Sequence, residues 1–497
     1  MSGTTQRLAP DTLARVPADV ARPRYDRAKV ASGILHLGLG TFHRAHQAVY
    51  TDAVLAEDPR WGIVGVSLQS PDMRERLRPQ GGLYSVLERE LTGTRVAVIG
   101  AIRRALFLGE DFGDVVRAFA DPRTKIVSLT VTEKGYCHDP ASRRLATGHP
   151  GLAHDYADPT RPQTTIGLLV AGLGIRRLAG SGPISVLSCD NLPENGHLLA
   201  ELVREYAGRV EPKLLRWLHE NVTFPSTMVD RRAPATTAVD LADAQACLGL
   251  HDAAAVACEP FTQWVIEDRF AAGRPAWEHA GAELVRDVVP YETMKLRMLN
   301  AAHSGIAYLG SLAGFEHTCD VVAVPAFASF ARALMREDAA PTLTLPPGVD
   351  AARYEAALLA RFANPALKHR CEQIATDGSQ KLPQRLLDTA RARLAAGATC
   401  EHVALAVAGW MRYVSGVDEQ GRRFEVRDPL AERLATIARD QGPDARTLAA
   451  SYLAVREVFA DDLPRMPAFA DAVGQAFASL CERGARATVE SRYGSRR

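Results

Sequence analysis

Short apolar runs alternate with amphipathic stretches in the first half of the chain. Four of these runs have the length and composition of strands buried on both faces: 33–37, 61–68, 125–132 and 184–189. Segments with helical periodicity lie between and after them, at about 44–55, 112–120, 165–178 and 196–207. Because strands that alternate with helices form parallel sheets, we predict an α/β fold with a Rossmann-like, doubly wound sheet over residues 1–286.

The pattern changes near Pro290 to long helical periods separated by proline and glycine turn signals. The candidate helices are 291–314, 323–336, 352–362, 366–376, 383–396, 400–415, 429–440, 446–459 and 467–484. They predict a second, mostly α-helical domain over residues 287–497. Since clefts between domains are favoured sites for small substrates, we expect the active site between the two domains.

One segment of this second domain contains a possible base, an amide and an imidazole: Lys295-Leu296-Arg297-Met298-Leu299-Asn300-Ala301-Ala302-His303. At 100° per residue, Asn300 lies about 140° and His303 about 80° from Lys295, so the three share one side of a helix. Apolar neighbours predict burial, which lowers the pKa of a lysine toward the range where it accepts a proton at neutral pH. The alternative is a lysine that reaches solvent from the edge of a core helix, with His303 only hydrogen-bonded.

A glycine turn, Gly38-Leu39-Gly40, directly follows the first predicted strand. Strand, tight glycine turn and helix form the first unit of a dinucleotide-binding fold, in which the pyrophosphate approaches backbone N–H groups. The third glycine of that pattern is replaced by His43, so an ordinary turn is the alternative. Asp72, after the second strand, would bond a ribose and exclude a 2′-phosphate, which favours NAD over NADP. Arg74 would favour a 2′-phosphate instead, and Asp72 could equally be a turn or helix-cap residue.

Polar loops follow the predicted strands at the end where such sheets bind ligands. Lys134 lies in the loop 132–136 (TEKGY), and Asn191 begins the loop 190–196 (DNLPENG) after the next strand. For Asn191 the alternative is a turn or cap residue. Asp230 and Arg231 follow a strand-like segment, and a structural salt bridge is the alternative there.

Composition and charge narrow the class of protein. Of the 497 residues, 47% are hydrophobic and 24% charged, and the net charge is +1, which argues against a nucleic-acid or membrane partner. No apolar run reaches 18 residues, so no membrane span is expected, and the polar N-terminus does not resemble a signal peptide. Eight scattered cysteines without a CxxC pair fit reduced thiols in the cytoplasm and give no zinc signature. The oligomeric state is not predicted.

Several motifs together resemble the polyol-specific long-chain dehydrogenases, the mannitol dehydrogenase family. They are GLGTFHRAHQ (38–47), SLTVTEKGYC (128–137), SCDNLPENGH (188–197), FPSTMVDR (224–231), CEPFTQWVIEDRF (258–270), VVPYETMKLRMLNAAHS (288–304), DGSQKLPQRLLD (377–388) and GWMRYVSGVDEQG (409–421). The resemblance spans nearly the whole chain and implies an NAD-dependent, metal-independent secondary-alcohol dehydrogenase.

The resemblance also implies roles for individual residues. Lys295 would be the general acid/base, Asn191 and Asn300 would form an oxyanion hole, and His303 would orient the substrate. Glu292 would carry the proton to solvent, and Asp230 and Lys381 would contact substrate hydroxyls. The cofactor NAD would be held by Gly38, Leu39, Gly40, Thr41, Phe42 and Asp72.

The chain is most similar to the fructuronate reductase subgroup of that family. Mannitol 2-dehydrogenases typically have an arginine where this chain has Gln373. Lys134 and Arg385 add cations that would pair with a substrate carboxylate, with surface or structural cations as the alternative. We therefore expect interconversion of D-fructuronate and D-mannonate. The alternatives are mannitol and fructose as substrates, another polyol or sugar acid, or an NAD-binding regulatory protein without activity.

Overall fold

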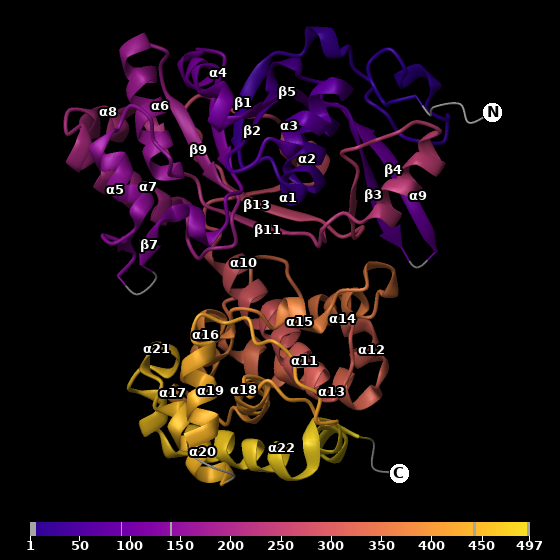
Figure 1. Cartoon of the computed structure of the whole chain (residues 1–497), viewed down its shortest axis with the longest axis vertical. Coiled ribbons are helices and arrows are strands. Elements are labelled where there is room, and N and C mark those ends of the chain that lie inside the picture. Colours follow the sequence, from indigo (N-terminus) through magenta and orange to yellow (C-terminus); the bar gives the residue numbers. More distant parts are fainter. Residues whose placement is uncertain (1–5, 91, 140–141, 441–443, 495–497) are drawn as a thin grey trace. The chain divides into compact units, whose positions relative to one another are not determined.

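The computed structural model describes residues 6–90, 92–139, 142–440 and 444–494. The chain divides into two compact units, Met1–Val289 and Pro290–Arg497. Strands are concentrated in the first unit, and the second unit is helical (Figure 1). No helix among the described residues is long and apolar enough to span a membrane.

A six-stranded parallel sheet forms the centre of the first unit. Its strands are β1 (Ser32–Leu37), β2 (Gly62–Ser67), β5 (Ile102–Phe107), β6 (Ile126–Leu129), β9 (Ile184–Ser188) and β10 (Val222–Thr223). Their order is β10-β9-β6-β1-β2-β5, and every neighbouring pair is parallel. The chain runs outward from β1 in one direction and then returns to β6 on its other side, so the switch point of the sheet lies between β1 and β6. The predicted Rossmann-like fold is confirmed.

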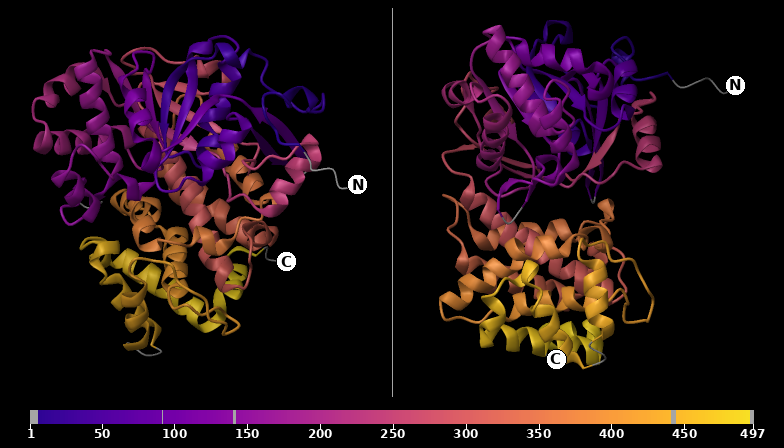
Figure 2. Two further views of the ribbon diagram at one scale, coloured as in Figure 1. Left: turned by 45° about the horizontal axis from the view of Figure 1, so that its top comes forward. Right: turned by 60° about the vertical axis from the view of Figure 1, so that its left-hand side comes forward.

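Both faces of this sheet are covered, which explains the continuous apolar runs of its strands. On one face, Leu35 and Leu37 pack in the same core as the helices α4 (Leu108–Ala120), α6 (Thr165–Ala179), α7 (Asn195–Val210) and α8 (Leu214–Asn221). On the other face, Ile34 packs in a core with α2 (Gln47–Val54) and parts of the small sheets. The left view of Figure 2 shows helices on both sides of these strands.

Three small sheets complete the first unit. One contains β11 (Thr227–Asp230), β13 (Gln263–Glu267) and β14 (Glu283–Val285); another contains β12 (Val256–Cys258), β3 (Tyr84–Glu90) and β4 (Gly93–Ile99); the third pairs β7 (His138–Asp139) with β8 (Arg144–Leu145). Its other helices are α1 (Thr41–Ala45), α3 (Asp72–Leu77), α5 (Pro150–Ala157) and α9 (Ala238–Leu248). The sequence pattern predicted neither β3 nor β4, because charged residues interrupt the alternation from Glu88 to Arg95.

The second unit consists of helices packed around α18. They are α10 (Val289–Met294), α11 (Ala301–Leu312), α12 (Thr318–Ala323), α13 (Pro325–Ala333), α14 (Ala351–Phe362), α15 (Cys371–Ile374), α16 (Gly378–Leu382), α17 (Asp388–Ala395), α18 (Glu401–Tyr413), α19 (Ala431–Asp440), α20 (Ala445–Leu453), α21 (Arg456–Phe459) and α22 (Pro467–Tyr493). Helix α18 is buried along nearly its whole length and packs against α11 and α22.

Some predicted helices in this unit have different bounds. The helix predicted at 366–376 is wrong: a 3₁₀ turn (Pro365–Leu367) ends at Lys368, whose positive φ of 42° stops a helix, and only α15 follows. The helix predicted at 446–459 is two helices, α20 and α21. The helix predicted at 467–484 extends further, to Tyr493. It is kinked at Gly484, which has a non-helical φ of 81°.

Among the described residues of the second unit, three turns are π-helical: η7 (Lys295–Asn300), η8 (Leu334–Ala339) and η11 (Pro383–Leu387). The turn η7 packs against both of the others. π-Helical turns are rare in proteins, but those that occur are often found at functional sites. The α-helical angles predicted for Lys295, Asn300 and His303 are therefore wrong within η7, because its hydrogen bonds join residues five apart.

Candidate active site

The π-helical turn η7 changes how Lys295 and Asn300 are arranged. The two residues are its first and last members and are five positions apart. In an α-helix this spacing would separate their directions by about 140°, but i→i+5 bonding places residue i+5 above residue i. The amine and the amide are consequently closer to one face than an α-helix allows. Such a pair suits an acid/base group next to a hydrogen-bond donor.

Lys295, Asn300 and His303 are all buried, as the sequence predicted. The Nδ2 atom of Asn300 has no hydrogen-bond partner among the described residues. A buried N–H donor without a partner costs free energy, on the order of 1–3 kcal/mol. It is therefore a candidate donor to a ligand oxygen.

The imidazole of His303 is oriented by aromatic neighbours. It stacks on the ring of Phe362 from α14, with centroids 5.2 Å apart and planes at 11°. His369 meets it edge-on at 5.0 Å. Glu292 is buried on α10, three residues before Lys295, a spacing that places neighbours on one side of a helix.

Arg385 lies next to the helix that carries His303. It belongs to η11, and its Nη1 donates to Oγ of Ser304 at 3.1 Å. Lys381 belongs to α16, and its Nζ donates to the carbonyl oxygen and the hydroxyl of Thr376. The structure therefore brings Arg385 to the Lys295–His303 segment, while Lys381 is anchored to the turn before its own helix.

The turn before Lys381 is tightly constrained. Asp377 has a positive φ of 53°, and a Cβ on Gly378 would lie 2.3 Å from Nε1 of Trp410 and 2.8 Å from the hydroxyl of Tyr308. The carboxylate of Asp428 accepts hydrogen bonds from the backbone N–H and the hydroxyl of Ser379 at 2.7 and 2.6 Å. The motif DGSQK thus places Lys381 through backbone geometry that depends on glycine.

In the first unit, the glycine turn lies at the switch point of the sheet. Gly38 has a φ of 96°, and a Cβ there would lie 2.1 Å from the carbonyl oxygen of Thr130, so only glycine fits. A Cβ on Gly40 would meet nothing closer than 3.7 Å, so the space before Gly40 is open. Gly40 precedes Thr41 and Phe42, the first residues of α1. This arrangement has the shape of a turn that admits a phosphate group.

A histidine pair occupies the position where the third glycine of the motif was missing. His43 of α1 stacks on His36 of β1, with centroids 3.4 Å apart and planes at 13°. Both rings are buried, and burial lowers the pKa of both imidazoles well below the usual range. In the usual motif the third glycine lets the helix pack closely on the strand. Here the neutral His36–His43 stack joins α1 to β1 instead.

Asp72 and Arg74 lie on α3, after β2. Asp72 is exposed in the first turn of the helix, whose N-cap is Pro71, and its role toward a cofactor stays a prediction. Arg74 pairs with Glu110 at 2.7 Å and with Asp111 at 3.2 Å. Because carboxylates already engage this guanidinium, Arg74 is poorly placed to bind a 2′-phosphate.

The loops after β6 and β9 are joined through Asp190. Its carboxylate accepts hydrogen bonds from the backbone N–H groups of Val131 and Thr132 at 3.1 and 2.8 Å, and from the hydroxyl of Tyr136 at 2.9 Å. Thr132 is held at a φ of 65°, which is strained for a β-branched residue. The loop of the exposed Lys134 is thus fixed to the loop of the exposed Asn191.

Asp190 makes the stability of the protein depend on pH. Burial raises the pKa of this carboxyl from 3.8 to about 6, although the backbone N–H groups of Val131 and Thr132 lower it. Between these values the folded protein holds a proton that the unfolded chain has released, so folding is favoured at the lower pH. We expect the wild type to lose about 2 kcal/mol of stability relative to Asp190→Asn as the pH rises from about 4 to about 7. Urea unfolding of both proteins across this range measures it, and parallel curves would contradict it.

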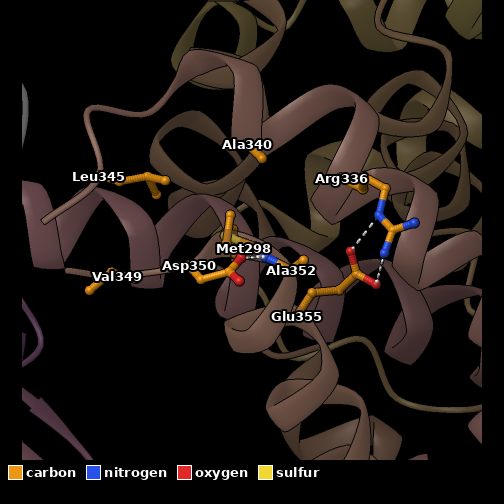
Figure 3. A pocket seen from close by; sticks show the side chains of 9 residues that line it. Met298, Arg336, Ala340, Leu345, Val349, Asp350, Ala352 and Glu355 are labelled. Carbon is orange, nitrogen blue, oxygen red and sulfur yellow. Dashed lines mark hydrogen bonds and ion pairs between the residues drawn. The ribbon is translucent and has the colours of Figure 1, made fainter.

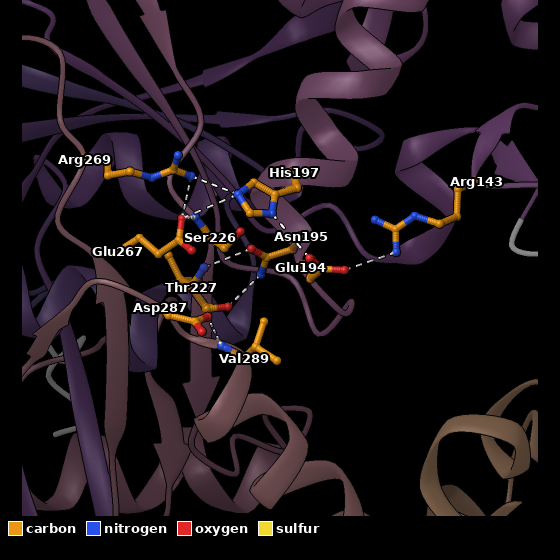
Figure 4. Close-up of polar contacts among 10 residues, drawn as sticks. All are labelled: Arg143, Glu194, Asn195, His197, Ser226, Thr227, Glu267, Arg269, Asp287 and Val289. Atoms are coloured by element: carbon orange, nitrogen blue, oxygen red, sulfur yellow. Dashed lines mark hydrogen bonds and ion pairs between the residues drawn. The ribbon is translucent and has the colours of Figure 1, made fainter. Parts of the chain in front are cut away.

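Asn195 is a buried polar residue next to the loop of Asn191, and the sequence pattern did not single it out. It is fully buried, and its Nδ2 donates to the carbonyl oxygens of Asp190 and Thr227 at 2.8 Å each. Its Oδ1 accepts from the backbone N–H of Thr227 at 2.9 Å (Figure 4). Asn195 thereby joins the loop of Asn191 to the strand β11, which ends at Asp230. Its place in a loop after a buried strand was the only available signal.

Asp230 is buried at the end of β11, and Arg231 follows it. Arg231 donates to the carbonyl oxygens of Glu259 at 2.9 Å and Ala45 at 2.7 Å, and it pairs with Glu88. The salt-bridge alternative is therefore correct for Arg231. Among the described residues, no group of three or more His, Cys, Asp or Glu side chains is placed to hold a metal ion.

Both units match models of one protein family. Residues 32–279 match the mannitol dehydrogenase Rossmann domain, and residues 287–481 match the mannitol dehydrogenase C-terminal domain. The chain therefore belongs to the mannitol dehydrogenase family, which confirms the resemblance seen in its motifs.

Individual relatives carry different substrate names. D-mannonate oxidoreductase of Escherichia coli K12 is 49% identical, with 95% of this chain and 97% of that protein aligned. The uncharacterized oxidoreductase YeiQ of the same strain is 48% identical over 96% and 98%. The solved Pseudomonas fluorescens mannitol 2-dehydrogenase, a ternary complex with NAD and D-mannitol, has a TM-score of 0.89 and 36% identity, covering 98% of this chain and 99% of that one.

Proposed function

We propose that this protein is an NAD-dependent oxidoreductase that interconverts D-fructuronate and D-mannonate. The observation that carries the sugar-acid assignment is Arg385, whose guanidinium lies 3.1 Å from Ser304, the neighbour of His303. A guanidinium pairs with a carboxylate in a bidentate geometry, and mannitol has no carboxylate. The 49% identity to D-mannonate oxidoreductase supports the same substrate.

Lys295 would move the proton at the reacting oxygen. In the reducing direction its ammonium gives a proton to the oxygen of the former carbonyl, and in the oxidising direction its amine takes the hydroxyl proton. Glu292, one turn earlier, would relay that proton to solvent. Asn300 would donate its unsatisfied Nδ2–H to the same oxygen and stabilise the negative charge that develops there. Asn191 is proposed as a second donor of this kind.

The cofactor would be held by the glycine turn of the first unit. NAD, when bound, supplies or accepts the hydride. Gly38, Leu39 and Gly40 form the turn, and the backbone from Gly40 to Phe42, where a Cβ on Gly40 would meet nothing closer than 3.7 Å, is proposed to approach the pyrophosphate. The pairing of Arg74 with Glu110 and Asp111 supports NAD over NADP, and Asp72 is proposed to contact the adenosine ribose.

The remaining polar residues would select the substrate. His303, held flat by Phe362, is proposed to orient the sugar chain, and Asp230 and Lys381 to contact its hydroxyls. Lys134 is proposed as a second cation toward the carboxylate. All eight cysteines are unpaired, which fits a reducing compartment, and we propose a cytoplasmic location.

The test is NADH oxidation with D-fructuronate, D-tagaturonate and D-fructose measured side by side. We expect the highest kcat/KM with fructuronate. Preference for fructose would instead make the protein a mannitol 2-dehydrogenase, the function named for its structural neighbour. NADH binding by fluorescence without turnover of any sugar acid or polyol would support a regulatory protein and contradict our proposal.

A further inference from the structure

Arg297 is the third polar side chain of the turn η7, between Lys295 and Asn300. Its Nη1 donates to the carbonyl oxygen of Thr342 at 3.0 Å and to the Thr342 hydroxyl at 2.9 Å. That hydroxyl in turn donates to the carbonyl oxygen of Ala339 at 2.7 Å, the last residue of η8. Arg297 therefore ties one π-helical turn to the end of another.

The turn η7 also packs against its neighbours, η8, η11 and α11. Met298, from the same turn, lines a cavity of about 450 Å³ together with Ala340, Leu345 and Val349 (Figure 3). Figure 3 also shows the ion pair of Arg336 and Glu355 at the cavity wall, joined at 3.0 and 3.1 Å.

A π-helical turn needs support from neighbouring elements, because α-helical hydrogen bonding is the ordinary state of a helix and π-bulges are rare. If η7 relaxed to an α-helix, Asn300 would turn to about 140° from Lys295. The amine and the amide would then point in directions farther apart than they do in the π-helical turn. The half-buried guanidinium of Arg297 crosses from η7 to Thr342 on a neighbouring element.

We infer that Arg297 is a positioning residue whose hydrogen bonds to Thr342 hold η7 in the π-helical form and keep Lys295 and Asn300 aligned. The inference rests on the proposed function, because alignment matters only if both groups act on one substrate oxygen. Arg297 touches neither substrate nor cofactor in this role.

The test compares Arg297→Met and Thr342→Val with matched controls in the full-length protein. Thr342→Ser keeps the hydroxyl acceptor, and Arg412→Met removes a similar arginine that donates to the Val417 carbonyl and the Ser415 hydroxyl far along the sequence. We expect Arg297→Met to lower kcat about 100-fold, with NADH affinity and substrate KM within about twofold of wild type. Thr342→Val should lose less, Arg297→Lys should recover part of the rate, and both controls should keep it.

Two further readouts separate positioning from general stability. The pH profile of kcat should shift in Arg297→Met, since the surroundings of Lys295 change, and the double variant with Thr342→Val should be no slower than Arg297→Met alone. Unchanged kcat and pH profile in Arg297→Met, or an equal loss in Arg412→Met, would overturn the inference.

Failure of the proposed function gives a different result. If the proposed function is wrong, the wild type turns over none of the substrates. Backbone amide hydrogen exchange still tests whether Arg297 holds η7 in the π-helical form. We expect faster exchange at residues 296–301 in Arg297→Met, with the rest of the second unit unchanged. Unchanged exchange in this segment would overturn the inference whatever the substrate.

Discussion

Replacing Lys295 by alanine is expected to lower turnover by about three orders of magnitude or more while NADH still binds. The lysine is buried, begins the turn that ends at Asn300, and is the proposed proton donor. Removing an acid/base group costs about 10²–10⁴ in rate, and loss of its charge beside the reacting oxygen adds to this. Stopped-flow or steady-state NADH oxidation measures the rate, and fluorescence titration measures NADH binding.

Two controls sharpen this experiment. Lys368→Ala removes an exposed lysine of the same unit and should leave the rate unchanged. Added methylamine should restore part of the turnover of Lys295→Ala in proportion to its concentration, because a small amine can take the place of the missing group. Turnover of Lys295→Ala near the wild-type value would refute the assignment of Lys295 as acid/base.

Arg385→Ala is expected to lower kcat/KM for fructuronate by about a thousandfold and for fructose by less than about tenfold. Truncating one partner of a buried charge pair costs about 2–5 kcal/mol, and only the uronate presents the partner carboxylate. Arg385→Lys keeps the charge but loses the bidentate geometry, so its loss should be intermediate. Steady-state kinetics on both substrates measures the ratio.

Loss of the Ser304 hydrogen bond is common to both substrates and does not affect this ratio. Arg391→Ala is the matched control, because Arg391 lies on the following helix and pairs with Asp462. Arg391→Ala should leave kcat/KM unchanged for both substrates. Equal losses of kcat/KM on fructuronate and fructose in Arg385→Ala would contradict pairing of Arg385 with a substrate carboxylate. They would favour mannitol and fructose as the substrates instead.

Four strands of the central sheet could be predicted because burial on both faces leaves a plain signal; β5, which contains Arg103 and Arg104, and the two-residue β10 were not predicted. Strands such as β1 and β9 have no exposed face, so they appear in the sequence as short, mostly apolar runs between helical segments. The hairpin of β3 and β4 has one partly exposed end with charged residues, and its pattern is not that of a buried strand. Periodicity alone could not find it.

The incomplete glycine motif shows a second limit. A missing third glycine weakened the prediction of a dinucleotide turn, and nothing local indicated what replaced it. His43 stacks on His36, whose ring is held by hydrogen bonds to Ser128 and Thr130 from the neighbouring strand β6 and the loop after it. The compensation depends on residues some 90 positions away, which a local motif does not contain.

By itself, the sequence determined the α/β class, the helical second unit and the family, and it singled out Lys295, Asn191, Asn300 and His303 as candidate site residues. It did not determine how Lys295 and Asn300 are aligned, because α- and π-helical turns have no distinct local sequence signal. That choice depends on tertiary contacts: Arg297 with Thr342, and η7 against η8 and η11. The same holds for Asp190 and Asn195, whose hydrogen-bond partners lie on other segments of the first unit.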